Sequence, residues 1–463
     1  MDIALIGGNY LTEDPENPIL KDGVLIISDN KINELGKKSE IDFSGRNIEK
    51  IFLTDHHLVM PGLVNTHTHL SMTLLRGYSD DKDLHEWLEK DIFPAESVLN
   101  PDDIFLGARL GAIESALAGV TTVNSMYHSA NKEADALQSV GLRGVVGNVC
   151  FSWRKKTDIQ VTDELIRNYH DKGLIRVSID PHTSYTCDPD LLLKLKEKII
   201  KYTNKTDRKH KTDLIWHTHI SETDKETQLT KEYLKNYLKD KEIEEYFENN
   251  STLEYYEKLG LFKENDFHIP VIAAHCVHLN DKDFQVIKRN KINVSTNPIS
   301  NLKLGSGIAP VPEMLKNNIL VGIGTDGPSS NNSLDVFDSM RTLGLLYKGL
   351  NHDPTILKSN QVVSMATQSG AKSLGFNNLG ALKKNYLADI IIINFKKPHL
   401  SPIYNYYSHL VYAVRAGDVE TTIIDGKLVV EDRNPLHVDL DVLIEEIDEK
   451  KQNIMLRILE NLA

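Results

Sequence analysis

The sequence predicts an α/β protein: a (β/α)8 barrel of the TIM type with a small β-sandwich domain built from both chain ends. Three observations support this fold class. Eight short apolar segments alternate with longer segments of helical spacing in the middle of the chain. The segments at both ends instead show the two-residue alternation of half-buried strands. A chain of 463 residues also exceeds what one hydrophobic core holds, so a large and a smaller domain are expected.

The eight apolar segments are the expected barrel strands. Nearly continuous apolar runs are typical of strands that are covered on both faces, and their alternation with helices indicates parallel pairing. The expected strands occupy residues 58–67, 119–126, 143–150, 174–180, 213–219, 270–276, 292–297 and 319–326. Between them lie helical segments such as residues 102–119.

The two chain ends are expected to form the sandwich together, because neither offers enough strands to bury a face alone. Residues 23–36 and 388–395 are typical strand segments, and Asp425-Gly426 predicts a tight hairpin turn. The expected boundaries are 1–58 for the first part of the sandwich, 59–375 for the barrel, and 376–463 for the rest of the sandwich with a terminal helix.

Composition excludes several classes of partner. The formal net charge of −13 disfavours nucleic acid and anionic membranes, both of which need a basic protein face, but it is compatible with a small nucleoside. No apolar run approaches the ~18 residues of a membrane span, and the N-terminus lacks the features of a signal peptide. The three cysteines lie far apart, which predicts neither a disulfide framework nor a thiolate metal site. We therefore expect a cytoplasmic protein.

Residues 223–259, rich in charged residues, asparagine and tyrosine, interrupt the compact alternation after the fifth expected strand. We expect a solvated pair of helices with charge pairs four residues apart. A lid over the active face of the barrel is the alternative.

Candidate metal ligands occur at the C-terminal ends of the expected strands, which share one face of a barrel. A lone histidine is usually a hydrogen-bonded core residue, but five histidines and an aspartate at equivalent strand ends indicate a common site. These residues are His67, His69, His182, His219, His275 and Asp326. Three imidazoles and a carboxylate suit zinc, although iron or manganese fits the same ligands. No lysine ends the fourth strand to bridge two metals, so one ion per chain is expected.

Glu222, three residues beyond His219, is the expected general base and acid, because a carboxylate beside an activated water can take and return its proton. The alternative is a structural glutamate at a helix N-terminus. Of the other histidines, His217 is expected to support the site from behind or to pack in the core, and His278 to lie in a loop.

Five ordered sequence blocks resemble the amidohydrolase superfamily. They are PGLVNTHTHLSMTLLRG, HTHISE, AAHCVHL, SNLKLGSGIAPVPEML and GTDGPSSNNSLDVFDSMR. Together they are similar to the branch that contains the 5-methylthioadenosine/S-adenosylhomocysteine deaminases and the triazine chlorohydrolases. The resemblance covers nearly the whole chain.

The resemblance implies a role for each site residue. Zinc would be bound by His67, His69, His219 and Asp326. Glu222 would carry a proton from water to a ring nitrogen, and His275 would orient the attacking oxygen beside Asp326. Substrate would be bound by His182 at the purine, Glu96 at the ribose hydroxyls and Trp87 over the base or ribose. Without the resemblance, Glu96 reads as a surface residue and Trp87 as core packing.

One departure from the family pattern concerns the 5′ end of the substrate. Arginines after the third strand bind the amino-acid carboxylate of S-adenosylhomocysteine in this branch, whereas this chain has Asn148 there and its nearest basic cluster begins at Arg154. Asn148 and Arg154 are therefore the candidate residues for this end, and small or apolar 5′ groups are favoured over S-adenosylhomocysteine.

The expected reaction is hydrolytic deamination of an adenosine-type nucleoside to its inosine analogue and ammonia. The candidate substrates are 5′-methylthioadenosine, S-adenosylhomocysteine, adenosine and 5′-deoxyadenosine. Guanine deamination and triazine dechlorination are alternatives on the same site, and a catalytically dead barrel that acts as a scaffold is the non-enzymatic alternative. The resemblance also implies a homo-oligomer.

Overall fold

The barrel is present in the computed structural model, which describes residues 2–44, 46–205 and 212–462. Its eight strands follow the order β17-β16-β15-β12-β11-β10-β9-β8, and every neighbouring pair is parallel. The backbone N–H of Asp326, beyond β17, donates to the carbonyl of His67 in β8 at 3.0 Å, which brings the last strand back to the first. The predicted (β/α)8 barrel is confirmed.

A barrel strand overlaps each of the eight predicted segments, and several strands extend one residue beyond them. The strands are β8 (Leu63–Thr68), β9 (Val120–Tyr127), β10 (Arg143–Cys150), β11 (Ile175–Pro181), β12 (Ile215–Ile220), β15 (Val271–His275), β16 (Asn293–Thr296) and β17 (Val321–Ile323). The helices packed around them include α3 (Pro101–Leu117), α4 (Ala130–Val140), α5 (Lys155–Tyr169), α6 (Pro189–Lys205), α10 (Asp281–Asn290), α12 (Val311–Lys316), α13 (Val336–Asn351), α14 (Ser359–Ala366) and α15 (Gln368–Ser373).

The prediction of a single strand over 58–67 is wrong. Two strands divide this segment: β7 (His57–Pro61) joins the sandwich, and β8 begins the barrel. The change of sheet occurs at Gly62, where a Cβ would lie 2.2 Å from the side chain of Thr121. Continuous apolar character does not reveal such a change, because both strands are buried.

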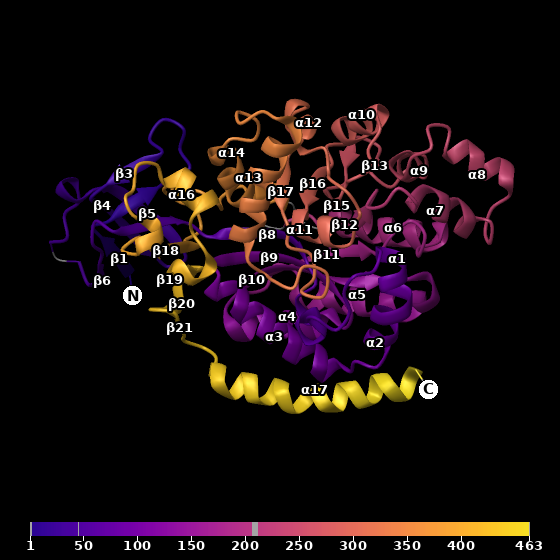
Figure 1. Ribbon diagram of the computed structural model, residues 1–463, viewed down its shortest axis with the longest axis horizontal. Coiled ribbons are helices and arrows are strands. Elements are labelled where there is room, and N and C mark those ends of the chain that lie inside the picture. The colour runs from indigo at the N-terminus through magenta and orange to yellow at the C-terminus, as the bar shows by residue number, and fades with distance from the viewer. Residues whose placement is uncertain (1, 45, 206–211, 463) are drawn as a thin grey trace.

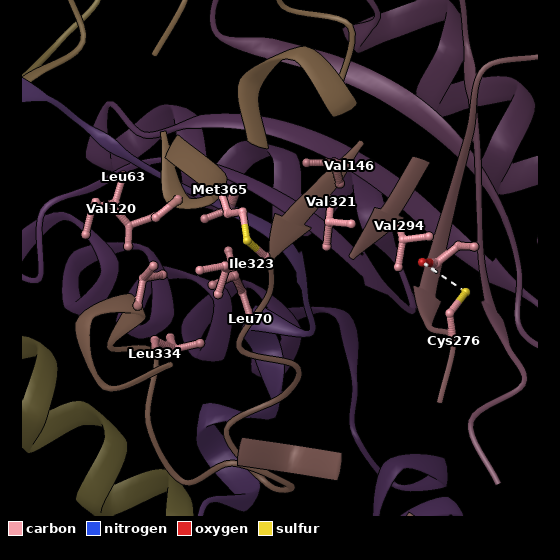
Figure 2. Packing of buried hydrophobic residues seen from close by; sticks show 14 of the residues in the cluster. Leu63, Leu70, Val120, Val146, Cys276, Val294, Val321, Ile323, Leu334 and Met365 are labelled. Carbon is pink, nitrogen blue, oxygen red and sulfur yellow. Dashed lines mark hydrogen bonds between the residues drawn. The ribbon is translucent and has the colours of Figure 1, made fainter. Parts of the chain in front are cut away.

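The barrel buries apolar side chains on two surfaces. Strand residues such as Leu63, Val120 and Val321 face outward and pack against the surrounding helices (Figure 2). Inside, side chains near the N-terminal ends of four strands form an apolar plug with residues from α15 onward: Val64, Val145, Ile215, Ile272, Ala371, Leu374, Phe376 and Leu379. The plug fills one end of the barrel and leaves the C-terminal strand ends for polar groups.

The sandwich joins both chain ends, as predicted. One sheet has the order β5-β4-β1-β6, and the other has the order β21-β20-β19-β18-β7-β2-β3. Their strands are β1 (Asp2–Ile6), β2 (Asn9–Leu11), β3 (Ile19–Lys21), β4 (Gly23–Ser28), β5 (Lys31–Lys37), β6 (Ile48–Phe52), β18 (Ile390–Asn394), β19 (Val419–Ile424), β20 (Lys427–Glu431) and β21 (Asn434–Pro435). The predicted hairpin turn links β19 and β20, with positive φ at Asp425 and Gly426.

The charged segment after β12 forms three short helices instead of the predicted pair. They are α7 (Glu226–Leu234), α8 (Asp240–Tyr246) and α9 (Thr252–Lys258), at the end of the molecule opposite the sandwich (Figure 1). Asn250, which has positive φ, lies in the turn between the last two helices.

The chain ends in the predicted terminal helix, α17 (Leu440–Leu462), which runs beside α2 (Phe93–Ser97) and α3 (Figure 1). Its buried Ile454 and Ile458 pack with Leu75 and Ala95, and Arg457 donates to Asp103 of α3 at 2.7 Å. Within the described ranges, no helix has the length and apolar character that a membrane crossing requires.

A buried ion pair connects the barrel to the sandwich. Arg143, at the start of β10, donates two hydrogen bonds to Asp389 beside β18, at 2.8 and 3.0 Å, and a third to Asp425 at 2.8 Å. The pKa of Arg143 is therefore raised despite its burial, because the two carboxylates stabilise its charge. The exposed pair Arg46–Glu34 within the sandwich is the natural comparison.

We expect Arg143→Met to lower the free energy of unfolding by about 3–5 kcal/mol, because it leaves Asp389 buried without its partner. Arg46→Met is the matched control and should cost less than about 1 kcal/mol, because water and salt screen that pair. Urea unfolding followed by circular dichroism measures both. Equal losses in the two variants would contradict the argument.

Candidate active site

Four side-chain atoms converge at the C-terminal end of the barrel. The Oδ1 atom of Asp326 lies 3.1 Å from Nε2 of His69 and 3.3 Å from Nε2 of His67. The Nε2 atom of His219 lies 3.4 Å from that of His69. These are the four residues expected to bind the ion. His67 lies in β8 and His69 directly after it, His219 lies in β12, and Asp326 lies in the turn after β17.

The spacing of these atoms fits one zinc ion. Four ligand atoms placed tetrahedrally at about 2.0–2.1 Å from zinc lie about 3.3 Å apart. The three measured separations, 3.1, 3.3 and 3.4 Å, agree with that value. In addition, Nε2 of His67 is buried and has no hydrogen-bond partner among the described residues, as expected of an atom reserved for a metal.

In each of the three imidazoles, the Nδ1 atom makes a contact that orients the ring. Nδ1 of His69 donates to the carbonyl of Met126 at 2.6 Å, and Nδ1 of His219 donates to the carbonyl of His182 at 2.9 Å. Nδ1 of His67 faces Nε2 of His217 at 2.8 Å. These contacts orient all three Nε2 atoms toward one point.

Asp326 is fixed by two serines. Its Oδ2 atom accepts hydrogen bonds from Ser300 at 2.6 Å and from Ser330 at 2.9 Å, which leaves Oδ1 toward the imidazoles. Asp326 has a φ of 63°, a left-handed conformation that costs free energy for a residue with a side chain. Such strain is typical of functional turns.

His275 lies against the same group of atoms. It forms a second potential metal-binding triad with His67 and Asp326. Nδ1 of His275 donates to the amide oxygen of Asn301 at 2.7 Å, so Nε2 remains free to accept a proton or a hydrogen bond. His275 also has a positive φ, 72°.

Glu222 lies beside the ligands, in the loop before α7. Its Oε1 atom is 3.6 Å from Nδ1 of His275. Burial, reinforced by the charges of Asp326 and Glu226, raises the pKa of the Glu222 carboxyl well above its usual range. A carboxyl group with a raised pKa holds a proton readily, as a proton carrier requires. The helix-capping alternative does not describe this position, because α7 begins only at Glu226.

A cavity opens above these residues. Besides the candidate ligands His69, His219 and Asp326, five of the expected residues line it: Trp87, Glu96, His182, Glu222 and His275. Much of the remaining wall is apolar or aromatic, with Leu84, Leu88, Phe93, Tyr127, Val149, Phe151 and Tyr185. Of the residues that the structure describes, none that lines the cavity is a lysine or an arginine, and none belongs to the segment 223–259.

Burial, and then the charges that neighbouring imidazoles would carry, lowers the pKa of His182 to about 3. His182 is therefore neutral at physiological pH and offers a hydrogen bond without a charge. Trp87 is buried, and its indole N–H donates to the carbonyl of Ser79 at 3.2 Å, so its ring is fixed in the cavity wall.

Glu96 is held by a chain of polar contacts. Arg154 donates to Nδ1 of His128 at 2.8 Å and to Asp158 at 2.8 Å. Because arginine only donates, the proton of a neutral His128 lies on Nε2, which faces Oε2 of Glu96 at 3.4 Å. The carboxylate of Glu96 is therefore oriented by a histidine that faces the same cavity.

The structure does not bring Asn148 and Arg154 to the cavity wall. Side chains alternate along β10, so Val149 faces the cavity, and the buried amide of Asn148 donates to the carbonyl of Val149 instead. Arg154 contacts His128, behind Glu96, and Asp158.

Several supporting residues are absent from the sequence-based site. Ser300, Asn301 and Ser330 lie after strand ends, in the blocks that carry the family resemblance. Their position in the sequence could therefore have predicted that they lie at the site. Glu226 accepts hydrogen bonds from the backbone of Ser221 and Glu222 at 2.8 and 2.9 Å, and no local pattern distinguishes it from other charged residues of its segment.

Comparisons with known proteins show the family of this chain. The model of the amidohydrolase family matches residues 58–429. A 5′-deoxyadenosine deaminase of Methanosarcina acetivorans is 37% identical over 98% of this chain and 99% of its own. A 5-methylthioadenosine/S-adenosylhomocysteine deaminase of Syntrophomonas wolfei is 39% identical over 94% of each chain.

Among solved structures, an adenosine deaminase of Xanthomonas campestris with bound zinc has a TM-score of 0.85 and 26% identity over 98% of this chain and 99% of its own. The match extends over the barrel and both ends of the chain. This chain belongs to the amidohydrolase family.

Proposed function

We propose that this protein is a zinc-dependent deaminase that converts adenine nucleosides with a small, uncharged 5′ end to their inosine analogues and ammonia. The observation that carries the proposal is one cavity at the four converging ligand atoms, three of whose residues line it, with Glu222 beside them and Glu96 in its wall, and without a lysine or arginine among its described lining residues. The names of the relatives support deamination of such nucleosides.

The ion would be held by His67, His69, His219 and Asp326. Bound zinc supplies a Lewis acid that lowers the pKa of a coordinated water toward ~7, so that a nucleophile is available at neutral pH. Iron or manganese would be held by the same atoms.

The proton transfer is assigned to Glu222. Its carboxylate takes a proton from the attacking water and delivers it to N1 of the adenine ring, which makes C6 electrophilic. The oxygen adds at C6, ammonia leaves, and the ring becomes hypoxanthine, so one water is consumed for each ammonia released. The raised pKa of Glu222 favours the protonated state that donates to N1. His275, with Nε2 free, orients the attacking oxygen.

The remaining lining residues position the nucleoside. His182 is neutral and contributes a hydrogen bond to the purine. Glu96 accepts hydrogen bonds from the ribose hydroxyls, and its contact with His128 directs it into the cavity. Phe151 stacks on Trp153, with ring centroids 4.5 Å apart, and forms part of the apolar wall.

The alternatives fit these features less well. Guanine and chlorotriazines have no ribose and leave Glu96 with His128 but without hydroxyl partners in a largely apolar cavity, which is costly for a carboxylate. A scaffold without catalysis needs neither the converging ligand atoms nor the acid group beside them. A cytoplasmic location and a homo-oligomer remain predictions from the sequence.

The experiment that tests this function is ammonia release by zinc-loaded protein from 5′-deoxyadenosine, 5′-methylthioadenosine, adenosine, S-adenosylhomocysteine, guanine and a chlorotriazine. We expect the first three to be substrates. For S-adenosylhomocysteine we expect kcat/KM at least about 100-fold below that for 5′-methylthioadenosine, because its carboxylate finds no cation in the cavity wall. Turnover of guanine alone, or chloride release from the triazine, would overturn the proposal.

We expect Glu222→Gln to keep its zinc and to lower kcat for 5′-deoxyadenosine by about 10²- to 10⁴-fold, the usual contribution of a general acid and base. Steady-state kinetics and metal analysis of the same sample measure both properties. Glu232→Gln, an exposed glutamate of α7, is the control and should behave as the wild type. Near-normal turnover of the zinc-loaded Glu222 variant would remove this residue from the mechanism.

We expect Glu96→Ala to lower kcat/KM for 5′-deoxyadenosine by about 10- to 100-fold, the loss for a hydrogen bond to a charged group. Activity on free adenine should change little, so the preference for the nucleoside should shrink. Glu89→Ala, which alters an exposed glutamate nearby, is the control. An equal loss on adenine and on the nucleoside would show that Glu96 does not recognise ribose.

A further inference from the structure

His67 differs from His69 and His219 in the hydrogen-bond partner of its Nδ1 atom. The Nδ1 atoms of His69 and His219 bond to backbone carbonyls, whereas Nδ1 of His67 bonds to a second histidine, His217, at 2.8 Å. The rings of His67 and His217 are nearly perpendicular, with centroids 5.0 Å apart. Both side chains are completely buried. A side chain is more mobile than a backbone carbonyl, so His217 itself needs a fixed orientation.

Asp180, in β11, faces the far side of His217. Its Oδ2 atom lies 3.5 Å from Nδ1 of His217, and its side chain is also completely buried. Neither carboxylate oxygen of Asp180 has a hydrogen-bond partner among the described residues. A buried carboxylate without partners is strongly unfavourable, so such a residue indicates a specific role.

The neighbouring strand is shaped to admit this carboxylate. Gly147 of β10 lies opposite it, and a Cβ at position 147 would lie 2.1 Å from the carboxyl group of Asp180. Every residue other than glycine would therefore displace Asp180 from His217. Two adjacent strands together make room for one acid group in the barrel interior.

The direction of the hydrogen bonds follows from metal binding. An imidazole that binds an ion through Nε2 carries its proton on Nδ1, so His67 donates to Nε2 of His217. A neutral His217 then has its own proton on Nδ1, the atom that faces Asp180. The three residues form a continuous sequence of groups from the ion to a carboxylate, one residue longer than the common carboxylate–histidine–metal arrangement.

We propose that His217 and Asp180 are positioning residues that orient His67 and strengthen the binding of the metal ion. Neither touches the substrate cavity, so neither is a catalytic residue. The inference rests on the proposed role of His67 as a metal ligand. It adds that the affinity of the site for zinc depends on the carboxylate of Asp180, which acts on the ion through His217 and His67.

The test is the dissociation constant of zinc, measured by competition with a chromophoric chelator in the absence of substrate. We expect Asp180→Asn to weaken zinc binding by about 10- to 100-fold, the usual effect of removing a supporting group of this kind. Ser178→Ala is the matched control: Ser178 lies two residues earlier on β11 and is equally buried, and its hydroxyl has no partner among the described residues. The control should bind zinc as the wild type does.

A double-mutant cycle separates this role from general packing. His217→Phe keeps an aromatic ring but cannot transmit the interaction, so it should weaken zinc binding by a similar factor. In the His217→Phe background, Asp180→Asn should change the zinc dissociation constant by less than about twofold, because the two residues act in series. Thermal unfolding of the metal-free proteins shows which variants fold, and His217→Phe alone tests the proposal if the Asp180 variant does not.

The outcomes distinguish this proposal from the proposed function. Unchanged zinc affinity in the folded variants, or independent effects that multiply in the double variant, would overturn the role of His217 and Asp180 and leave the deaminase standing. A wild-type protein that binds no zinc would overturn the metal site, and this proposal with it. Weakened binding in both single variants without a further loss in the double variant is the result we expect.

Discussion

The site depends on the convergence of four candidate metal-binding atoms within 3.4 Å of their neighbours. Packed together in a buried space, three imidazoles and a carboxylate would be unfavourable unless an ion or protons compensated them. The left-handed backbone at His275 and Asp326 adds strain of about 1–3 kcal/mol each. Hydrogen bonds to Asp326 and from the Nδ1 atoms of the imidazoles offset part of this cost and orient the ligand atoms. The serines on Asp326 and the carbonyls on His69 and His219 belong to the site as much as the ligands do.

The barrel provides this convergence because parallel strands place residues far apart in sequence at one end. Between His67 and Asp326 lie more than half of the chain's residues, yet their backbones are joined by a hydrogen bond of 3.0 Å. The interior is layered along the strands. An apolar plug that includes Val64 and Val145 fills the N-terminal end, and the polar group of Asp180 and His217 lies between the plug and the ligands. Apolar packing therefore stabilises the barrel, and this stability offsets the cost of burying the polar layers.

The sequence was sufficient for the barrel, because buried parallel strands are continuous apolar runs. It was also sufficient to predict that the four candidate ligands lie together, because these residues follow strand ends directly. Where a prediction required knowledge of which way a side chain points, it was less successful. The side chain of Asn148 points away from the cavity, and that of the next residue, Val149, lines it. The break between β7 and β8 lies inside one apolar run, at Gly62. The pairing of Asp180 with His217, and of Arg154 with His128, joins separate strands and loops, and no local pattern records such contacts.

Substrate selection illustrates why the presence of a charged residue near a site is insufficient evidence for its role. Arg154 begins the basic cluster nearest to Asn148, the position where a carboxylate-binding arginine is expected. Its guanidinium is already engaged by Asp158 on one side and by His128 on the other. A cation in two such contacts must give up one of them to bind a substrate carboxylate, and the loss of the His128 contact would also release Glu96. The arginine that would be needed to bind S-adenosylhomocysteine is therefore engaged in holding Glu96, the residue that we propose binds ribose, and this arrangement supports the proposed preference for nucleosides whose 5′ end carries no charge.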